Sequence, residues 1–201
     1  MAPAIDKAAA APDPRDMKIL GAIFAGGAAR RFGGDKHAAM IDDHAMIDHV
    51  VARLAAQCDA VVVVGRAWPG LTDVADAPAP GLGPLGALAG ALAYAQASGF
   101  DLVLTSGCDL PDIPLDLATR LSPAPAVVAG QPLLGLWPSA SADRLIEWLV
   151  AGEDRAMRAW IARMAARRVA LAADPANINT QADLARYVAG FKPPADPRSS
   201  R

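Results

Sequence analysis

The chain of 201 residues lacks a strong excess of charge of either sign. Its 19 Lys and Arg residues are balanced by 21 Asp and Glu residues, and no run of cations forms a basic stripe. Nucleic acids and anionic membranes attract proteins through concentrated positive charge, so this balance argues against both as the main partner. A small phosphorylated ligand remains compatible, because it needs only a few local cations.

Cysteine is scarce and long apolar segments are missing. Cys58 and Cys108 form no framework of spaced disulfide pairs, which favours a reducing compartment. Charged residues interrupt the Ala- and Pro-rich first 16 residues, unlike the apolar core of a secretion signal. No stretch is long and apolar enough to cross a bilayer. Together these features predict a cytoplasmic protein.

Aromatic residues are also few. They make up 5% of a chain that is 53% hydrophobic, so Ala, Leu and Val must supply most of the packing. This length suffices for one domain with a sizeable core. We predict a single domain at residues 18–189, between a flexible leader at 1–17 and a flexible, Pro-containing tail at 190–201.

Strand-like and helix-like segments alternate through this domain. β-branched or short apolar runs predict strands at 18–25, 59–64, 101–106, 125–129 and 132–137. Apolar residues at helical spacing, with Pro and Gly at helix ends, predict helices at 44–57, 85–97, 114–121, 143–150, 157–164 and 181–188. The alternation predicts an α/β fold with a mostly parallel sheet covered on both faces. Ligands of such folds bind beyond the carboxyl ends of strands, here the loops after Ala25, Val74 and Ser106.

The loop after the first predicted strand combines glycines with cations. Residues 25–36 read AGGAARRFGGDK. Glycine lets the backbone approach a phosphate closely, and the arginines and Lys36 add positive charge. This is not a Walker A loop, because Asp35 precedes Lys36 and His37 follows it. A surface loop with solvated charges is the alternative, but the position after a buried strand favours phosphate binding.

The same loop resembles the signature of the molybdenum cofactor guanylyltransferases, nucleotidyltransferases with a three-layer Rossmann-like fold. The matching residues are Phe24, Ala25, Gly26, Gly27, Arg31, Phe32, Gly33, Asp35 and Lys36. The resemblance implies that the first four of these lie against a guanine nucleotide. It also implies that Lys36 contacts the phosphates, with Arg31 as a second phosphate contact.

A second glycine segment has the spacing G-x-G-x-x-G at Gly81, Gly83 and Gly86. This pattern alone suggests a dinucleotide site. It follows a Pro-rich loop instead of a strand and sits late in the chain, so a turn before a Pro-started helix is favoured over NAD binding.

The same segment, with Asp76 before it, is similar to the acidic residue and Gly-Pro-Leu-x-Gly motif of the guanylyltransferases. The resemblance implies that Asp76 contacts the nucleotide and that Gly83, Pro84 and Leu85 border the base pocket. A carboxylate suits guanine, whose N1–H and exocyclic amine are paired donors that adenine and cytosine do not present.

The predicted strand at 101–106 runs into Cys108 and Asp109. A carboxylate at this position can hold Mg²⁺, which would bridge triphosphate oxygens, or it can cap a helix. The guanylyltransferases have Cys-Asp-x-Pro here, and this resemblance implies that Asp109 is the metal ligand. Cys108 could be proposed as a nucleophile, but without a His partner a small buried thiol is expected. The three histidines lack zinc-site spacing.

The second half of the chain resembles the family at Gln131-Pro132 and at Asn177-Ile178-Asn179-Thr180. The resemblance implies that this half binds a molybdopterin acceptor, with Asn177 and Asn179 as polar contacts. Turn and cap roles are the alternative for both asparagines.

Tryptophans and arginines of this half invite other interpretations. Apolar helix stripes hold Trp148 and Trp160, which favours core packing over stacking on a pterin. Five arginines form a loosely basic region that either attracts an anionic acceptor or covers solvated helix faces. They are Arg155, Arg158, Arg163, Arg167 and Arg168.

The resemblance covers residues 18–187 and implies Mg²⁺-dependent transfer of GMP from GTP to the terminal phosphate of molybdopterin. Lys36, Asp109 and Arg31 would be the catalytic residues. A molybdoenzyme or a cofactor-insertion protein would be a further partner. Two alternatives remain: a related nucleotidyltransferase using CTP or a sugar-phosphate acceptor, and a non-catalytic nucleotide-binding protein that delivers cofactor. The chain departs from the family at Gly65, where some members place an Asn that contacts the nucleotide, and in a short 122–130 connection.

Overall fold

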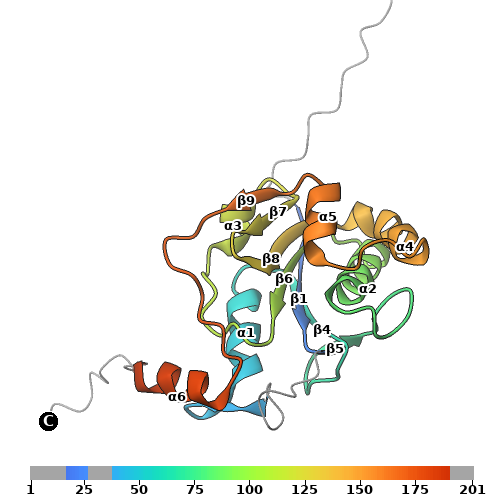
Figure 1. Ribbon diagram of the computed structural model, residues 1–201. Coiled ribbons are helices and arrows are strands. Elements are labelled where there is room, and N and C mark those ends of the chain that lie inside the picture. The colour runs from blue at the N-terminus through green and yellow to red at the C-terminus, as the bar shows by residue number, and fades with distance from the viewer. Residues whose placement is uncertain (1–16, 27–37, 191–201) are drawn as a thin grey trace, which may run out of the picture.

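A computed structural model describes residues 17–26 and 38–190 of the chain (Figure 1). Its strands are β1 (Ile19–Phe24), β2 (Met40–Ile41), β3 (His44–Ala45), β4 (Ala60–Val64), β5 (Thr72–Val74), β6 (Leu102–Gly107), β7 (Ala126–Val128), β8 (Gln131–Pro138) and β9 (Arg167–Val169). Its helices are α1 (Met46–Ala55), α2 (Pro84–Ala97), α3 (Leu117–Leu121), α4 (Ala142–Val150), α5 (Met157–Arg163) and α6 (Gln181–Gly190).

One seven-stranded sheet forms the centre of the molecule, in the order β5-β4-β1-β6-β8-β7-β9. The four strands from β5 to β6 run parallel, β8 is antiparallel to both of its neighbours, and β9 is parallel to β7. The mostly parallel α/β sheet predicted from the sequence is therefore confirmed. A separate β2–β3 hairpin precedes α1.

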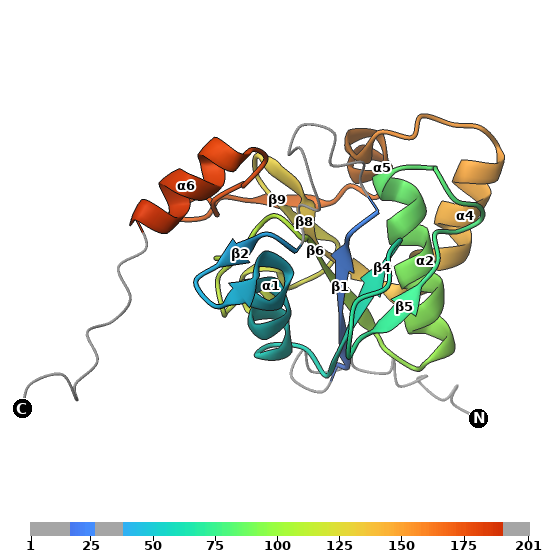
Figure 2. The same ribbon diagram turned by 90° about the horizontal axis from the view of Figure 1, so that it is seen from below.

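Helices cover both faces of the sheet, because the central strands are apolar on both sides (Figures 1 and 2). On one face α1 and α3 bury Val50, Leu54 and Leu117. On the other face lie α2, α4 and α5. These three layers are those of a Rossmann-like fold.

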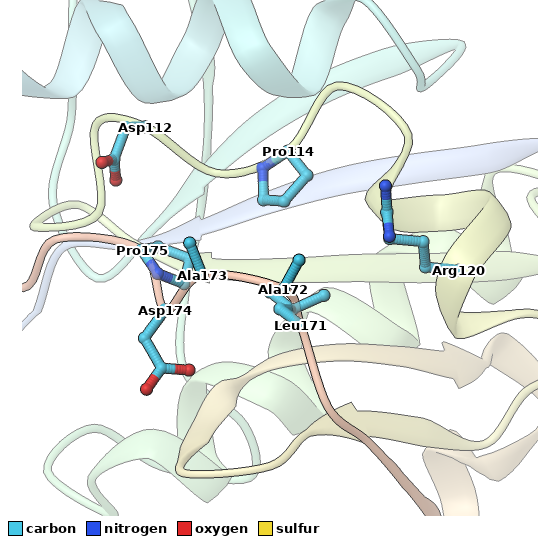
Figure 3. Close-up of a pocket in the computed structure, with 8 residues that line it drawn as sticks. All are labelled: Asp112, Pro114, Arg120, Leu171, Ala172, Ala173, Asp174 and Pro175. Carbon is cyan, nitrogen blue, oxygen red and sulfur yellow. The ribbon is translucent and has the colours of Figure 1, made fainter.

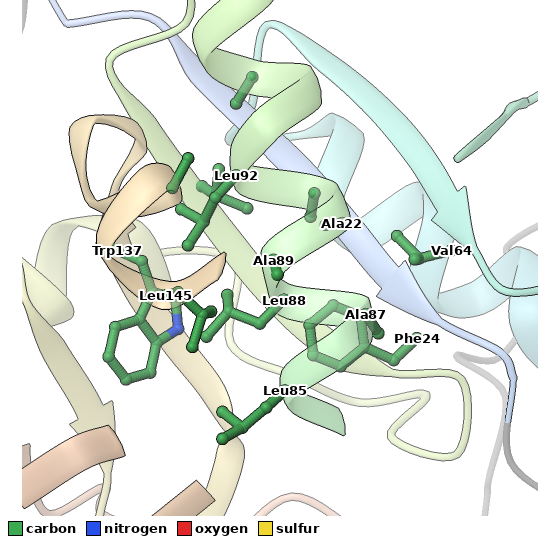
Figure 4. Packing of buried hydrophobic residues seen from close by; sticks show 14 of the residues in the cluster. Ala22, Phe24, Val64, Leu85, Ala87, Leu88, Ala89, Leu92, Trp137 and Leu145 are labelled. Carbon is green, nitrogen blue, oxygen red and sulfur yellow. The ribbon is translucent and has the colours of Figure 1, made fainter. Parts of the chain in front are cut away.

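Helix α2 is the most deeply enclosed of these helices. It is apolar around most of its circumference and is packed between the sheet and α4, as expected for a helix without a polar face. Figure 4 shows Leu88 near Leu145 and Trp137, and Phe24 beside Ala87. Pro84 occupies the first turn, as the sequence predicted.

Most predicted elements are confirmed, and the errors lie at their ends. The predicted helix at 44–57 begins at Met46, because His44 and Ala45 form β3. The helix predicted from Pro114 begins only at Leu117. Strand β9 was missed, since it is three residues long and begins with two exposed arginines. The short strands β2, β3 and β5 were not predicted either.

Trp148 and Trp160 pack in or against the core, as predicted. Trp137 and Trp160 are fully buried, and half-buried Trp148 meets Trp160 edge-on with ring centroids 6.2 Å apart. Within the described residues, no helix combines the length and apolar character needed to cross a membrane.

The buried hydroxyl of Thr105 joins β6 to β8, and its removal gives a test of the core. Thr105 Oγ1 donates a hydrogen bond to the Leu133 carbonyl (2.7 Å) and accepts from Gly135 N (3.2 Å) and Trp137 Nε1 (3.4 Å). Thr105→Val keeps the shape but leaves these buried donors without an acceptor. We expect the free energy of unfolding in urea to fall by about 1–3 kcal/mol. Thr105→Ser, which keeps the oxygen, is the control, and a Val variant as stable as the wild type would contradict this role.

Candidate active site

The strand order reverses at β1, and this reversal locates the candidate site. The chain passes from β1 through α1 to β4 on one side of β1, whereas α2 leads to β6 on its other side. In open α/β sheets ligands bind beyond the carboxyl ends of the strands at such a reversal, so the ends of β1 and β6 mark the candidate site (Figure 2). Phe24 lies opposite Gly107 and Val64 in the register, so the three strands end at the same level.

Hydrogen bonds from the ends of β4 and β6 fix the chain where it leaves β1, at Phe24 and Ala25. Ala25 N donates to the Val64 carbonyl (3.0 Å), and Cys108 N donates to the Phe24 carbonyl (3.3 Å). The Phe24 side chain is buried in the core, so its backbone is the part available to a ligand. Gly26, two residues further on, is exposed. The predicted contacts Gly27, Arg31 and Lys36 lie outside the described residues.

Gly26 and Asp76 come together through Gly65, at the ends of β1, β4 and β5. Gly65 has a φ of +85°, and a Cβ built on it would lie 2.9 Å from the Cα of Gly26 and 3.6 Å from Asp76 Oδ1. Two backbone segments and a half-buried carboxylate therefore meet within a few ångströms. No side chain at position 65 would fit without moving them.

The start of α2 fixes the loop that carries Asp76. Ala77 N donates to the Gly86 carbonyl (3.0 Å), which ties this loop to the first turn of the helix. Gly83 has a φ of +66° and precedes Pro84. The Leu85 side chain is fully buried, so its backbone is the part available to a ligand at this end of α2. The segment thus starts a helix after a Pro-rich loop, as the favoured interpretation of its three glycines predicted.

Asp109 lies two residues beyond the end of β6, the strand that pairs with β1. It is half-buried, and its carboxylate turns back over Gly107, where a Cβ would overlap Asp109 Oδ1. Asp109 does not cap a helix, because the next helix is α3 and the residue before it is Asp116. Cys108 beside it is buried, which agrees with the small buried thiol expected from the sequence.

The segment with Asn177 and Asn179 lies beside Asp109. Ile178 N donates to the Asp109 carbonyl (3.1 Å), which brings the second half of the chain to the end of β6. Both asparagines are exposed, and Asn179 Nδ2 donates to Asn177 Oδ1 (2.6 Å). The arrangement unites residues predicted from two distant motifs.

The predicted start of the last helix is confirmed. Thr180 Oγ1 accepts from Asp183 N, and the Asp183 carboxylate accepts from the backbone N–H groups of Asn179 and Thr180. The Thr180 hydroxyl, then Arg186, lower the pKa of Asp183 by hydrogen bonding.

The carboxylate of Asp109 suits a magnesium ion that is bound together with phosphates. Among residues 17–26 and 38–190, no group of three or more His, Cys, Asp and Glu side chains could enclose a metal ion. Mg²⁺ is usually held by one or two carboxylates plus substrate phosphates, not by a cage of protein ligands. A single carboxylate beyond the end of β6 therefore fits this ion.

Two arginines of the basic region, Arg158 and Arg167, make different contacts. Arg167 lies on β9 and donates to the carbonyls of Leu121 (3.0 Å) and Ser122 (2.8 Å), so it holds the end of α3. Arg158 pairs with Asp154 on the surface. Arg167 thus lies on a strand and not on a helix face, which corrects the second interpretation offered for it.

Sequence reasoning also missed a hollow between the loop after β6 and the segment after β9 (Figure 3). Its lining residues are Asp112, Pro114, Arg120, Leu171, Ala172, Ala173, Asp174 and Pro175. No local pattern in the sequence joins these two segments.

This topology, with Gly26 after β1, Asp76 after β5 and Asp109 after β6, fits a nucleotidyltransferase of the α/β class. Residues 21–170 match the family of MobA-like NTP transferase domains, and the chain belongs to that family. The enzyme class predicted from the sequence is confirmed by this match.

Curated relatives agree with this assignment. A protein named molybdenum cofactor guanylyltransferase from Acidiphilium cryptum is 37% identical over 89% of this chain and 98% of its own. A protein of the same name from Cereibacter sphaeroides is 35% identical over 85% of this chain and 95% of its own. The crystal structure of molybdopterin-guanine dinucleotide biosynthesis protein A from Archaeoglobus fulgidus has the same fold. Its TM-score is 0.63 at 20% identity, over 83% of this chain and 95% of that one.

Gly90 gives a test of how Asp76 is placed. A Cβ at Gly90 would overlap the Ala75 carbonyl and lie 3.4 Å from the Asp76 Cα. Helix propensity alone predicts that Gly90→Ala stabilises the protein by about 0.5–1 kcal/mol. We expect the opposite, a loss of about 1–3 kcal/mol in urea unfolding, because overpacking must displace the backbone before Asp76.

Gly190→Ala is the matched control, since no atom of the described residues lies within 4 Å of its built Cβ at the end of α6. A stabilised Gly90→Ala protein would contradict the close approach of α2 to residue 75.

Proposed function

We propose that this protein transfers GMP from GTP to the terminal phosphate of molybdopterin or molybdenum cofactor, with Mg²⁺ and release of pyrophosphate. One observation carries the proposal: Gly26 and Asp109 follow adjacent parallel strands at the switch point of the sheet. The names of the curated relatives support the choice of guanine nucleotide and acceptor.

On the nucleotide side, Phe24, Ala25, Gly26 and Gly27 line the bound GTP. Asp76 accepts hydrogen bonds from guanine, and the base rests against the start of α2 at Gly83, Pro84 and Leu85. The convergence of Gly26, Gly65 and Asp76 supports this assignment.

On the phosphate side, Lys36 and Arg31 contact the triphosphate and, with the loop N–H groups, stabilise the charge of the transition state. Asp109 would hold Mg²⁺, which offsets negative charge on the phosphates when bound. The acceptor phosphate attacks the α-phosphorus in line, a new P–O bond forms and the bond to pyrophosphate breaks. A phosphate is already nucleophilic, so no strong general base is needed.

On the acceptor side, Asn177 and Asn179 make polar contacts with molybdopterin. Their place beside Asp109 supports this role, because the acceptor must reach the α-phosphorus near the metal. The catalytic domain at 18–189, a cytoplasmic location, and delivery to a molybdoenzyme or a cofactor-insertion protein remain predictions from the sequence.

Nucleotide preference is tested by thermal denaturation with GTP, CTP, ATP or UTP, each with Mg²⁺ or EDTA. A ligand that binds only the folded state raises stability by RT ln(1 + [L]/Kd), about 2.7 kcal/mol at 100-fold excess over Kd. We expect a Mg²⁺-dependent rise in Tm confined to GTP. A larger rise with CTP would instead favour a cytidylyltransferase, and no rise with any nucleotide would refute the nucleotide site.

The role of Asp109 is tested by pyrophosphate release with GTP, molybdopterin and Mg²⁺. Asp109→Ala and Asp109→Asn should each lower the rate by at least about 100-fold, because loss of a group that stabilises transition-state charge typically has this effect. Asp116→Ala is the control, since that carboxylate pairs with exposed Arg120. Substantial Mg²⁺-dependent turnover by Asp109→Ala would remove this residue from the role. GTP binding without pyrophosphate release by the wild type would favour the delivery protein.

A further inference from the structure

The segment between β9 and α6, residues 171–180, is here called the acceptor arm. It runs alongside the loop that follows β6, and Figure 3 shows its part at 171–175 facing Asp112 and Pro114 across the hollow. The arm contains no helix or strand of its own. Its position must therefore come from contacts with other elements.

Two hydrogen bonds fasten the arm on either side of Asn177. Before it, Ala176 N donates to Asp112 Oδ1 (2.9 Å), and after it Ile178 N donates to the Asp109 carbonyl (3.1 Å). Both acceptors belong to the loop after β6. The first bond has an ionised acceptor, and such charge-assisted bonds are about twice as strong as neutral ones.

Side chains of the arm alternate between the core and solvent in this stretch. Ile178 is 1% exposed, whereas Asn177 and Asn179 on either side of it are exposed and bonded to each other. The buried Ile178 thus sets which way the two amides face. A slip of one residue would bury an asparagine and expose the isoleucine.

Ile178 also joins the arm to the start of α1. It packs with Ile41 and Met46 in a small core, against which Leu184 and Tyr187 of α6 also rest. Burial, then the charge of nearby Asp112, raise the pKa of Tyr187. Asp112 therefore lies close to both the arm and the helix that follows it.

We propose that Asp112 is a positioning residue, which holds Asn177 and Asn179 beside Asp109 through its hydrogen bond to Ala176. This inference rests on the proposed function for the identity of the acceptor. Asp112 touches neither substrate in this scheme. It acts on acceptor binding through the backbone of the arm.

The test compares Asp112→Ala with Asp112→Asn in steady-state guanylyl transfer. Asparagine keeps an oxygen that can accept from Ala176 N, so it should behave like the wild type. Alanine should raise KM for molybdopterin about tenfold, the scale expected for loss of one hydrogen bond to a charged group. KM for GTP should change less than about twofold, because Asp76 and the glycine-rich loop are untouched.

Two further variants serve as a control and as an independent test of the arm's position. Asp116→Ala removes a carboxylate nearby in sequence that pairs with Arg120, and it should leave both KM values unchanged. Ile178→Val trims the small core under the arm and should raise KM for molybdopterin in the same direction as Asp112→Ala. Equal effects of Asp112→Ala and Asp112→Asn, an unchanged KM for molybdopterin in Asp112→Ala, or equal changes in both KM values would overturn the proposal.

Hydrogen exchange by mass spectrometry tests the same contact without activity. Peptides covering residues 175–190 should exchange faster in Asp112→Ala than in the wild type, Asp112→Asn or Asp116→Ala. Unchanged exchange would overturn the positioning role. A wild-type protein with no transferase activity but this exchange pattern would refute the proposed function and keep Asp112 as the residue that holds the arm.

Discussion

The in-register pairing of β1 between β4 and β6 is the constraint on which the site depends. It sets Phe24 level with Val64 and Gly107, so that the chain leaves all three strands at one edge of the sheet. A shift of one residue would turn every side chain of β1 to the opposite face. The side chains from Leu20 to Phe24 are buried on both faces, and the fit of these residues to the two helix layers opposes such a shift.

Close backbone approach is the second requirement, and glycine meets it in three places. Gly65 lies against Gly26, Gly90 lies against residue 75, and Gly107 leaves room for the Asp109 carboxylate. Of these, Gly90 lies inside a helix, where glycine is normally unfavourable. Its presence in α2 is explained by the loop it admits, which carries Asp76.

Local signals made much of this predictable. The apolar runs of β1, β4 and β6 predicted three of the parallel strands, Pro84 predicted the start of α2, and the Thr180–Asp183 spacing predicted the start of α6. The position of Asp109 at the end of β6 followed from the same pattern.

What sequence reasoning missed depends on partners far apart in the chain. Strand β9 exists because it pairs with β7, and its arginines carry no strand pattern of their own. The bond from Ala176 to Asp112 joins segments 64 positions apart. The roles of Arg31 and Lys36 remain predictions, since both residues lie outside the described part of the chain.

The departure at position 65 bears on how this member of the family would select its base. Some members have an asparagine there, whereas in this chain a Cβ would lie 2.9 Å from the Cα of Gly26. With φ at +85°, an asparagine would also require a backbone conformation that residues with side chains rarely adopt. The backbones at Gly26 and Gly65 therefore approach more closely than a side chain at position 65 would allow. Under the proposed function, recognition of guanine then falls to Asp76 and the backbone at the start of α2, whose relative position depends on Gly86 and Gly90.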